Sequence, residues 1–456
     1  MNVSAGDKVN WHVLRDGKGI AEPQGFFAAG VQAHVKYPGK YDVALVYSQC
    51  PAAAAAVYTS NLVQAHPLAL NRRHLADGRA QALVVNSGNA NACLGQQGDE
   101  AAWAMAEETA QALGLAPTDV VVASTGVIGQ RFPTERVRAG IRQAAEEIGA
   151  CRKMGVQEPA DRALSEQLAE GAHLASLAIM TTDLVQKQAA YELKLRGGTV
   201  RLGIMAKGSG MIHPQMGTML AFVTTDACVE AGRLQDLLRE AVDESFNMIT
   251  IDGDTSTNDM VVALANGCSG VELADEDWAA FCDLFREACR QMARAIASDG
   301  EGASKLLTVQ VTGASSKEQA RRVARAVCGS NLVKCAMYGR DANWGRIICA
   351  AGYAGVEIDP GKVSIFLNGL PVAAAGQEVP FDEREASQRL SGDSVTVHID
   401  LSGDRGGEMV DAGSELVVGN GMLGVGNRTL GSGFSATAWG CDLTHKYIDI
   451  NADYRS

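Results

Sequence analysis

The sequence lacks the features typical of nucleic-acid-binding and membrane proteins. Its 456 residues include 40 lysines and arginines against 53 aspartates and glutamates, which gives a formal net charge of −13. Binding to nucleic acid or to an anionic membrane surface needs clustered basic residues, so neither partner is expected. No uninterrupted apolar run reaches the length of a membrane-spanning helix. Small molecules are therefore the expected partners.

Motifs for metals, disulfides and nucleotide phosphates are also missing. The eleven cysteines are scattered singly with no CxxC pair, and the eight histidines form neither HxH nor HExxH. An odd number of dispersed cysteines is typical of reduced thiols, and no metal site is expected. The GxxxxGK[ST] spacing of a phosphate loop is absent. The polar amino terminus does not resemble a secretion signal, so we expect a cytoplasmic protein.

The residues that are present predict a globular protein of mixed α/β (α+β) class. Hydrophobic residues make up 46% and charged residues 20% of the chain, and its length exceeds what one hydrophobic core usually supports. Apolar runs predict strands, and helical spacing of apolar residues predicts helices. The expected strands are 41–48, 81–88, 200–208, 218–227, 304–313, 362–369 and 394–401, and the expected helices are 99–114, 133–150, 230–246 and 275–300.

A Gly-Thr pair at Gly217 and Thr218 precedes one of these strands. A structural interpretation is available, because glycine allows close approach of the backbone and threonine favours strands. A chemical interpretation is that the Thr218 hydroxyl attacks the Gly217 carbonyl, so that an N-to-O acyl shift and hydrolysis release chains 1–217 and 218–456. The new terminal threonine could then act as a nucleophile with its own α-amine as base.

Seven segments together carry a resemblance to a known family. They are VNSGNANACLG (85–95), ASTGVIGQ (123–130), IMTTD (179–183), AKGSGMIHPQMGTMLAFVTTDA (206–227), DGEGASK (299–305), GRDANWGRI (339–347) and SATAWGCDLTHKYIDINADYRS (435–456). In this order the chain resembles the ornithine acetyltransferase / bifunctional glutamate N-acetyltransferase family of arginine biosynthesis. The resemblance implies a layered sandwich of mixed sheets and helices of the ornithine acetyltransferase/aminopeptidase type. It also implies self-cleavage before Thr218 and a heterotetramer of two α (1–217) and two β (218–456) chains.

The resemblance also implies roles for individual residues. Thr218 would be both the cleavage residue and the acyl-carrying nucleophile, and Thr125 with Gly126 would form the oxyanion hole, where negative charge develops. The implied substrate-binding positions are Thr181, Lys207, Thr218, Glu301, Asn451 and Ser456. Lys207 would hold a substrate carboxylate and Glu301 the amine end of ornithine. The substrate-binding position assigned to Thr181 could instead be its neighbour Thr182, and this alternative stays open.

Each of these residues also has a purely structural interpretation. STG is a common turn sequence, a lysine is usually exposed, Thr181 could be a strand hydroxyl, and Glu301 could be a solvated surface residue. Chain ends such as Asn451 and Ser456 are often frayed. The polar segments NSGNANACLG and GDTSTND (253–259) are expected to be loops that shape the cleft, with no role assigned.

The sequence departs from the family pattern in three places. Gly217 stands where alanine is common, and Ser456 stands where threonine is common. The Gly-rich stretch 403–433 resembles an insertion, expected to be a surface loop or hairpin. The smaller residue at 217 leaves the carbonyl more open, and serine keeps the hydroxyl at 456, so neither change is expected to remove function.

The expected activity is transfer of acetyl from N-acetylornithine to Thr218 and then to glutamate, with no cofactor. Some members of the family also use acetyl-CoA as the donor to glutamate, which leaves it as a further candidate substrate. Two other interpretations stay open. One is an aminopeptidase or amidase-like hydrolase that passes the acyl group to water, and the other is a non-enzymatic binding protein with an intact chain.

Overall fold

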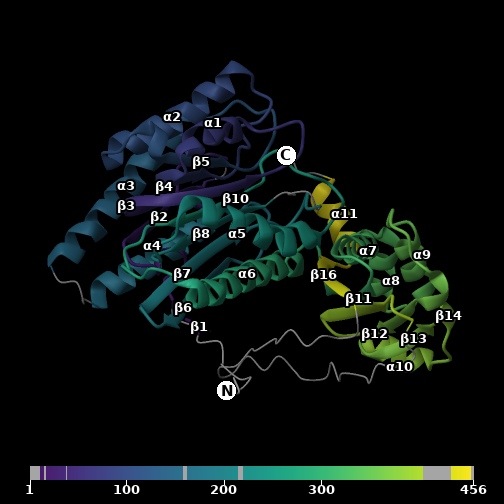
Figure 1. The fold of residues 1–456 in the computed structure, drawn as a ribbon. Helices are drawn as coiled ribbons and strands as arrows, with labels where there is room; N and C mark the ends of the chain where they lie inside the picture. The colour runs from purple at the N-terminus through teal and green to yellow at the C-terminus, as the bar shows by residue number, and fades with distance from the viewer. Residues whose placement is uncertain are drawn as a thin grey trace, which may run out of the picture. The chain divides into compact units, whose positions relative to one another are not determined.

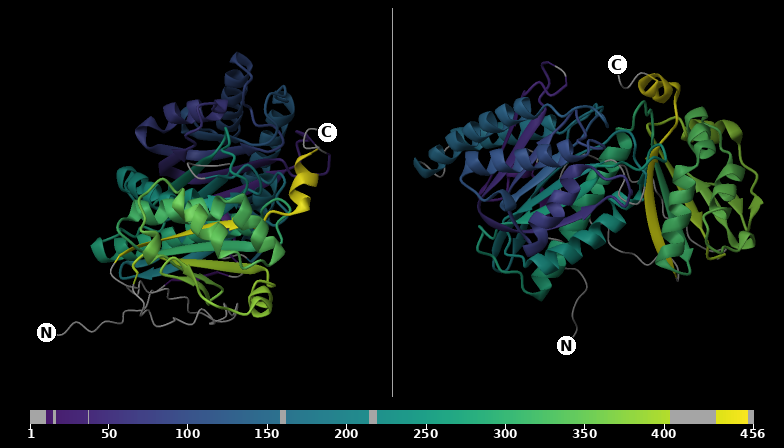
Figure 2. Two further views of the ribbon diagram at one scale, coloured as in Figure 1. Left: turned by 90° about the vertical axis from the view of Figure 1, so that its right-hand side faces the viewer. Right: turned by 90° about the horizontal axis from the view of Figure 1, so that it is seen from above.

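The computed structural model describes residues 11–14, 17–36, 38–157, 162–213, 219–403 and 433–452 (Figures 1 and 2). The chain divides into two compact units. Unit 1 comprises Met1–Gly208, Gln215–Asp243 and Thr255–Met292, and unit 2 comprises Ser209–Pro214, Glu244–Asp254 and Ala293–Ser456.

Unit 1 is built on a nine-stranded sheet with the order β1-β6-β7-β8-β10-β3-β4-β5, in which β2 also pairs with β3. Its strands are β1 (Trp11–Val13), β2 (Phe26–Val31), β3 (Val43–Tyr58), β4 (Arg79–Asn86), β5 (Val120–Ser124), β6 (Lys187–Leu195), β7 (Gly198–Lys207), β8 (Leu220–Thr225) and β10 (Met260–Ala265). Two neighbouring pairs, β8 with β10 and β4 with β5, are parallel. The mixed sheet confirms the predicted fold class.

Helices pack against the sheet of unit 1. The helices that begin in unit 1 are α1 (His66–His74), α2 (Gln96–Leu113), α3 (Thr134–Gln157), α4 (Arg162–Ala178), α5 (Ala231–Glu244) and α6 (Asp275–Ser298). Alternate residues of each strand point to opposite faces, and both faces of β3, β4 and β5 are buried. On one face, α2 and α3 pack against Leu45, Val84 and Val122.

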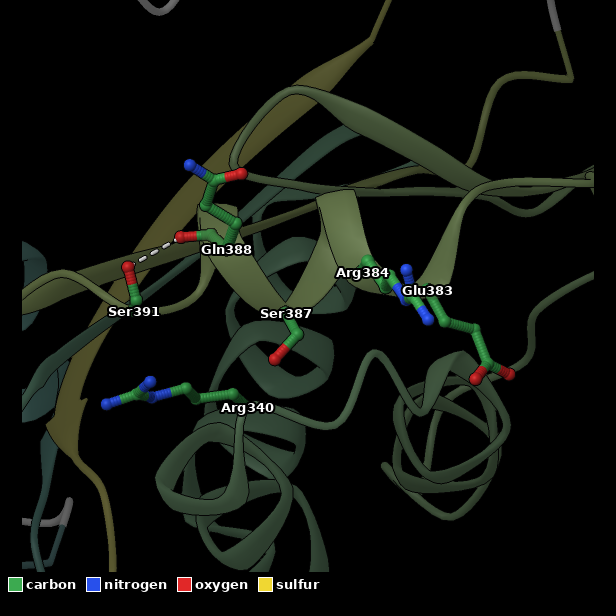
Figure 3. Close-up of a pocket in the computed structure, with 6 residues that line it drawn as sticks. All are labelled: Arg340, Glu383, Arg384, Ser387, Gln388 and Ser391. Atoms are coloured by element: carbon green, nitrogen blue, oxygen red, sulfur yellow. Dashed lines mark hydrogen bonds between the residues drawn. The ribbon is translucent and has the colours of Figure 1, made fainter.

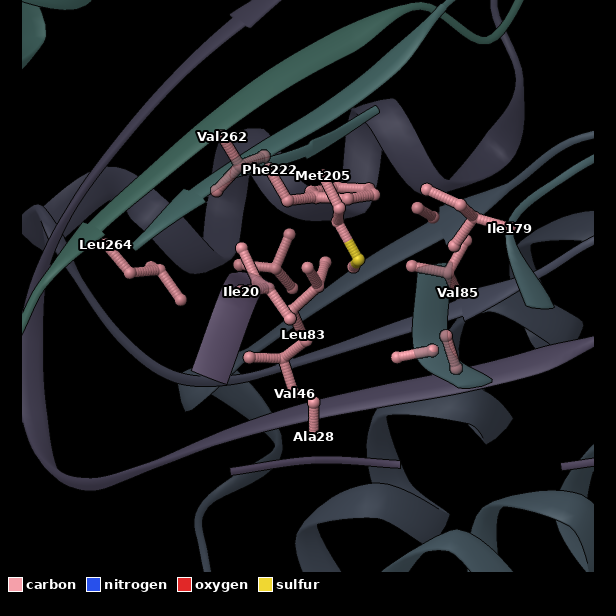
Figure 4. Packing of buried hydrophobic residues seen from close by; sticks show 14 of the residues in the cluster. Ile20, Ala28, Val46, Leu83, Val85, Ile179, Met205, Phe222, Val262 and Leu264 are labelled. Atoms are coloured by element: carbon pink, nitrogen blue, oxygen red, sulfur yellow. The ribbon is translucent and has the colours of Figure 1, made fainter. Parts of the chain in front are cut away.

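The other face forms the cluster drawn in Figure 4. Val46 of β3 and Leu83 of β4 lie on one side of this cluster, and Phe222 of β8 and Val262 of β10 lie on the other. The described part of unit 1 therefore has strands facing each other across a hydrophobic core. This arrangement agrees with the layered sandwich that the family resemblance implied.

Unit 2 is built on a seven-stranded sheet with the order β14-β13-β12-β15-β11-β16-β9. Its strands are β9 (Ile249–Thr250), β11 (Leu306–Ala314), β12 (Ser364–Leu367), β13 (Leu370–Ala374), β14 (Gln377–Glu378), β15 (Ser394–Asp400) and β16 (Phe434–Cys441). Its helices are α7 (Lys317–Gly329), α8 (Asn331–Gly339), α9 (Trp344–Gly352), α10 (Glu383–Arg389) and α11 (His445–Asn451). Ser316 caps α7 by accepting a hydrogen bond from the Gln319 N–H.

The predicted strands and helices correspond closely to the observed ones. The apolar run 41–48 is the first half of β3, and the predicted strands 200–208 and 218–227 correspond to β7 and β8. Those two strands pair with each other, so the chain on both sides of the predicted cut belongs to one sheet. Most of the Gly-rich stretch, residues 404–432, lies outside the described residues.

Candidate active site

The predicted cut between residues 217 and 218 lies outside the described residues, which resume at Met219. The backbone N–H of Met219 donates to Oδ1 of Asp259 at 2.8 Å. This contact follows from the parallel register, which places Met260 beside Leu220 and so brings the two preceding residues together. The buried carboxyl group of Asp259 therefore anchors Met219, the first described residue after the predicted cut.

Thr125 and Gly126, the predicted oxyanion hole, form a turn directly after β5. Thr125 is buried, and its N–H donates to the Asn86 carbonyl oxygen at 3.0 Å. Gly126 has a φ of +133°, and a Cβ there would lie 2.3 Å from the Gly88 carbonyl carbon and 2.5 Å from the Asn89 nitrogen. Only glycine fits this position, because both the dihedral angle and the backbone contact exclude a side chain.

Asn258 connects this turn to the GDTSTND segment, for which the sequence suggested no role. Its Nδ2 donates to the carbonyl oxygens of Ala90 at 2.6 Å and Ser124 at 2.7 Å. Ser124 immediately precedes Thr125, and the residue after Asn258 is Asp259. Asn258 therefore binds the residue before the predicted oxyanion turn, and the next residue, Asp259, binds Met219 beside the predicted cut.

Lys207 and Thr181, both predicted to bind substrate, are in contact in unit 1. Lys207 is the last residue of β7 and is 3% exposed, and its Nζ donates to Thr181 Oγ1 at 3.2 Å. The interpretation of Lys207 as an ordinary exposed lysine was wrong. Thr181 lies in the connection between α4 and β6, so it is not a strand hydroxyl. The hydrogen bond favours Thr181 over Thr182 as the residue beside Lys207.

Asp183 organises the positive charges around this contact. Its Oδ1 is 2.7 Å from Lys187 Nζ and accepts the Gly208 N–H at 2.7 Å, and its Oδ2 accepts the Thr181 N–H at 3.1 Å. The side chains of Asp183 and Lys187 are 0% and 1% exposed. Burial alone would raise the pKa of Asp183, but the charges of Lys187 and Lys207 outweigh it and hold the pKa below its usual range.

Asp183→Asn is expected to lower the free energy of unfolding by about 3 kcal/mol, because it leaves Lys187 buried without its counter-charge. The lowered pKa means that this stabilisation is present above the unfolded-state pKa of about 3.9. It is lost as the pH falls through the folded-state pKa. Urea unfolding between pH 3 and pH 7 measures both effects. Asp236→Asn removes an exposed ion pair with Arg239 and serves as the control; an equal loss in both variants would contradict the prediction.

Glu301 and Asn451 are in contact in unit 2. Glu301 lies between α6 and β11 and is 7% exposed. The interpretation of Glu301 as a solvated surface residue was therefore wrong. Its N–H donates to the Ser209 carbonyl oxygen at 2.8 Å, and its Oε2 accepts a hydrogen bond from Asn451 Nδ2 at 2.8 Å. A Cβ at Gly210 would lie 2.3 Å from Glu301 Cδ, so the carboxyl packs directly on this glycine.

The predicted site residues that the structure describes form three sets of direct contacts or neighbours. Thr125 with Gly126 and Thr181 with Lys207 are two groups of unit 1, and Glu301 with Asn451 is a group of unit 2. Gly217, Thr218 and Ser456 lie outside the described residues, and their roles stay predictions.

Sequence reasoning did not identify Asp183, Lys187, Asn258 and Asp259. Asp183 was present in the quoted IMTTD segment, and Asn258 and Asp259 end GDTSTND. A signal was therefore available in the polar residues of these segments. The role of Asn258 could not be deduced from them, because the two carbonyl groups that its Nδ2 binds belong to residues more than 100 positions away in the chain.

A hollow of about 550 Å³ opens on unit 2 beside α10 (Figure 3). Its lining residues are Arg340, Glu383, Arg384, Ser387, Gln388 and Ser391. In Figure 3 the side chain of Arg340 extends away from that of Arg384, so the two guanidinium groups do not converge on one point. None of the predicted site residues that the structure describes lines this hollow, and we assign it no role.

The described ranges contain neither a candidate metal centre nor a candidate membrane span. No group of three or more His, Cys, Asp or Glu side chains in these ranges could hold a metal ion. Within the same ranges, no helix is both long and apolar enough to cross a membrane.

Comparison with known sequences places the chain among well-defined relatives. Residues 27–420 match the family model described as the ArgJ family. The arginine biosynthesis bifunctional protein ArgJ of Symbiobacterium thermophilum is 48% identical over 443 residues, covering 96% of this chain and 98% of that protein. The protein of the same name from Geobacillus kaustophilus is 43% identical over 442 residues, covering 96% of each.

Two solved structures are also similar in sequence. The crystal structure of arginine biosynthesis bifunctional protein argJ from Bacillus halodurans is 42% identical with a TM-score of 0.43, covering 51% of this chain and 97% of that chain. The structure of ornithine acetyltransferase complexed with ornithine from Mycobacterium tuberculosis is 36% identical with a TM-score of 0.37, covering 45% of this chain and 98% of that chain.

Proposed function

The chain belongs to the ArgJ family of acetyltransferase enzymes, and we propose that it moves the acetyl group of N-acetylornithine to glutamate through an ester on Thr218. The observation that carries this proposal is the match of nearly the whole chain to relatives named for arginine biosynthesis, together with a Gly-Thr pair before β8. The first half-reaction acetylates Thr218 and releases ornithine. The second passes the acetyl group to glutamate and restores the hydroxyl.

The proposed nucleophile requires self-cleavage between Gly217 and Thr218. Within a chain the threonine hydroxyl has no base of its own, but at a new amino terminus its α-amine can take the proton. The reference pKa of an α-amine is about 7.7 to 8.0, so a useful fraction is unprotonated near neutral pH. Cleavage would give an α chain, 1–217, and a β chain, 218–456.

The strand order explains how such pieces would remain together. Strands β8 and β10 belong to the proposed β chain, and they lie between β7 and β3 of the proposed α chain. Separation would break the β7–β8 and β10–β3 ladders and expose the core in Figure 4. We propose that one α and one β chain stay paired in this way and that two such pairs form a heterotetramer.

The substrate contacts that we propose use the two buried polar groups of opposite charge. Lys207, beside Thr181, would hold a substrate carboxylate. Glu301, beside Asn451, would meet the side-chain ammonium of ornithine, and Ser456 would add a contact from the carboxyl end. Thr125 and Gly126 would stabilise the tetrahedral oxygen in both half-reactions.

We further propose that no cofactor is required. Both half-reactions transfer an acyl group without gain or loss of electrons, so a redox group would have no part in them. The relatives are named bifunctional, and acetyl-CoA is the second acetyl donor that we propose. A cytoplasmic location stays a prediction from the sequence.

The test is an assay of purified protein with N-acetylornithine, with and without glutamate, and then with acetyl-CoA plus glutamate. We expect ping-pong kinetics with parallel double-reciprocal lines, because one hydroxyl carries the acetyl group between two substrates that bind in turn. Mass spectrometry after incubation with donor alone should find acetyl on Thr218. Intersecting lines without a trapped ester would contradict the covalent route, and release of acetate at the full rate without glutamate would favour the hydrolase.

A further inference from the structure

Two cysteines that are distant in the sequence come together in unit 1. Cys50 lies in β3, and Cys268 lies in the turn that follows β10. The antiparallel pairing of β10 with β3 ends with Ala265 opposite Ala53, and each cysteine is three residues beyond that pair on its own segment. The two thiol groups are in hydrogen-bond contact. The order of the strands therefore brings these two sulfur atoms together.

A chain of hydrogen bonds connects the backbones of the two cysteines. Oγ of Ser48 donates to the Cys50 carbonyl oxygen at 2.7 Å, and Nδ2 of Asn266 donates to the same hydroxyl at 3.2 Å. Oδ1 of Asn266 accepts the Cys268 N–H at 3.0 Å. Nε2 of Gln49 donates to Cys268 Sγ at 3.8 Å. The two thiols are thus held in position by the side chains around them.

The position of the pair suits a covalent link. Cys50 and Cys268 are both partly exposed, so a small reagent can reach them. A Cβ at Gly25 would lie 2.8 Å from Cys268 Sγ, and glycine at this position therefore leaves room for the sulfur. Residues that face each other in an antiparallel pair have Cα atoms about 4.5 to 5.5 Å apart. A disulfide spans roughly 4.4 to 6.8 Å between Cα atoms, which includes this range.

We propose that Cys50 and Cys268 form a disulfide by exchange with a small organic disulfide. The thiolate of one cysteine attacks a sulfur of the small disulfide, whose S–S bond breaks to leave a mixed disulfide and one small thiol. The thiolate of the other cysteine attacks the protein sulfur of the mixed disulfide and displaces the second small thiol. The protein sulfurs are oxidised, the small disulfide is reduced, and the two protons that the cysteines lose pass to the two small thiols.

The surroundings of Cys268 favour the disulfide over the free thiolate. Burial, the neighbouring Cys50 thiol and the charge of Asp226 raise the pKa of Cys268 to about 11, and the hydrogen bond from Gln49 acts in the opposite direction. A disulfide is easily reduced when its thiolate form is stabilised, so a thiol that ionises with difficulty gives a disulfide that resists reduction. Only the thiolate attacks, so exchange should become faster as the pH rises.

The disulfide would join the two proposed chains, a consequence that rests on the proposed cleavage before Thr218. Cys50 belongs to chain 1–217 and Cys268 to chain 218–456. The link would lie beside the β10–β3 ladder, where strands of the two proposed chains pair. In the oxidised protein, separation of the chains would then need a reductant as well as unfolding.

The experiment compares purified protein incubated with oxidised glutathione and with dithiothreitol. On a non-reducing denaturing gel we expect the oxidised, self-cleaved protein to run as one band of 47.9 kDa and the reduced protein as two fragments. Peptide mapping should find two peptides joined through Cys50 and Cys268. The joined peptides should exceed the glutathione adducts of these cysteines at least about 10-fold, because groups held in contact react at high effective concentration.

Serine variants identify the sulfur atoms that form the link. Cys50→Ser and Cys268→Ser should each lose the joined band, and Cys93→Ser should keep it. Cys93 is the matched control, because it is an exposed cysteine of the same proposed chain as Cys50. A joined band that persists in either of the first two variants would overturn the proposal. A link from Cys50 to Cys228, whose Sγ donates to the Gly267 carbonyl oxygen at 3.5 Å, would overturn it as well.

Peptide mapping of the wild-type protein decides the proposal even where a variant does not fold. It also separates this proposal from the proposed function, because the disulfide can form in an intact chain. A chain that is never cut before Thr218 contradicts the proposed function, and joined Cys50 and Cys268 peptides from that chain would still support the disulfide. Glutathione adducts or free thiols in place of the joined peptides would overturn the disulfide in cut and uncut protein alike.

Discussion

Thr218→Ala is expected to give a single band of 47.9 kDa on a denaturing gel, where the wild-type chain gives two fragments. The alanine has no hydroxyl to attack the Gly217 carbonyl, so the N-to-O acyl shift cannot begin. Amino-terminal sequencing of the second wild-type fragment should start with Thr-Met-Leu-Ala. Acetyl transfer should fall on the order of 10⁶-fold, as happens when the nucleophile of a covalent mechanism is removed.

Thr218→Ser is the matched control, because it keeps the hydroxyl and removes one methyl group. It is expected to cut itself and to retain measurable transfer, with a melting transition close to that of the wild type. Fragments that persist in Thr218→Ala would show that another residue performs the cleavage. An uncut Thr218→Ala chain with normal turnover would show that the acyl group is carried elsewhere.

Thr125→Ala is expected to lower the kcat for acetyl transfer by about 100-fold, the usual loss when one donor of an oxyanion hole is removed. The turn after β5 is held by backbone contacts, including the Thr125 N–H to Asn86 and the Asn258 amide to the Ser124 carbonyl oxygen. Loss of the hydroxyl alone should therefore leave the backbone in place. Steady-state kinetics on fully cut protein, together with the melting temperature, measure the two effects separately.

Thr125→Ser tests the same prediction from the other side, because serine restores a hydroxyl at this position. It should recover most of the activity that alanine loses. Equal losses in the two variants would assign the effect to packing of the threonine methyl group. Normal activity in Thr125→Ala would remove Thr125 from the oxyanion hole and leave only the Gly126 N–H as a candidate.

The proposed self-cleavage would divide the strands of one sheet between two chains. The first strand after the proposed cut is β8, which pairs with β7 on one side and with β10 on the other. Met219, which directly precedes β8, is anchored by its hydrogen bond to Asp259. The same arrangement makes the proposed α and β chains interdependent, so stability measurements should report one cooperative unit for the nine-stranded sheet.

Local sequence patterns were sufficient to predict most of the elements and the family. Apolar runs such as 41–48 became strands buried on both faces, and helical spacing in 99–114 and 133–150 became α2 and α3. The family resemblance needed only short segments in order, which are properties of the chain and not of its folding. The resemblance also singled out Thr125, Lys207 and Glu301, whose roles stay predictions; their burial could not be deduced from residue type, because most lysines and glutamates are exposed.

The partners of these residues depended on the tertiary structure. Lys207 meets Thr181 from 26 positions away, Asp259 meets Met219 from 40, and Asn451 meets Glu301 from 150. No local period encodes such pairs, since they arise from strand order and register and not from neighbouring residues. The parallel pairing of β8 with β10 placed a buried carboxyl group beside the chain at the predicted cut, and only the folded sheet could assign Asp259 to that position.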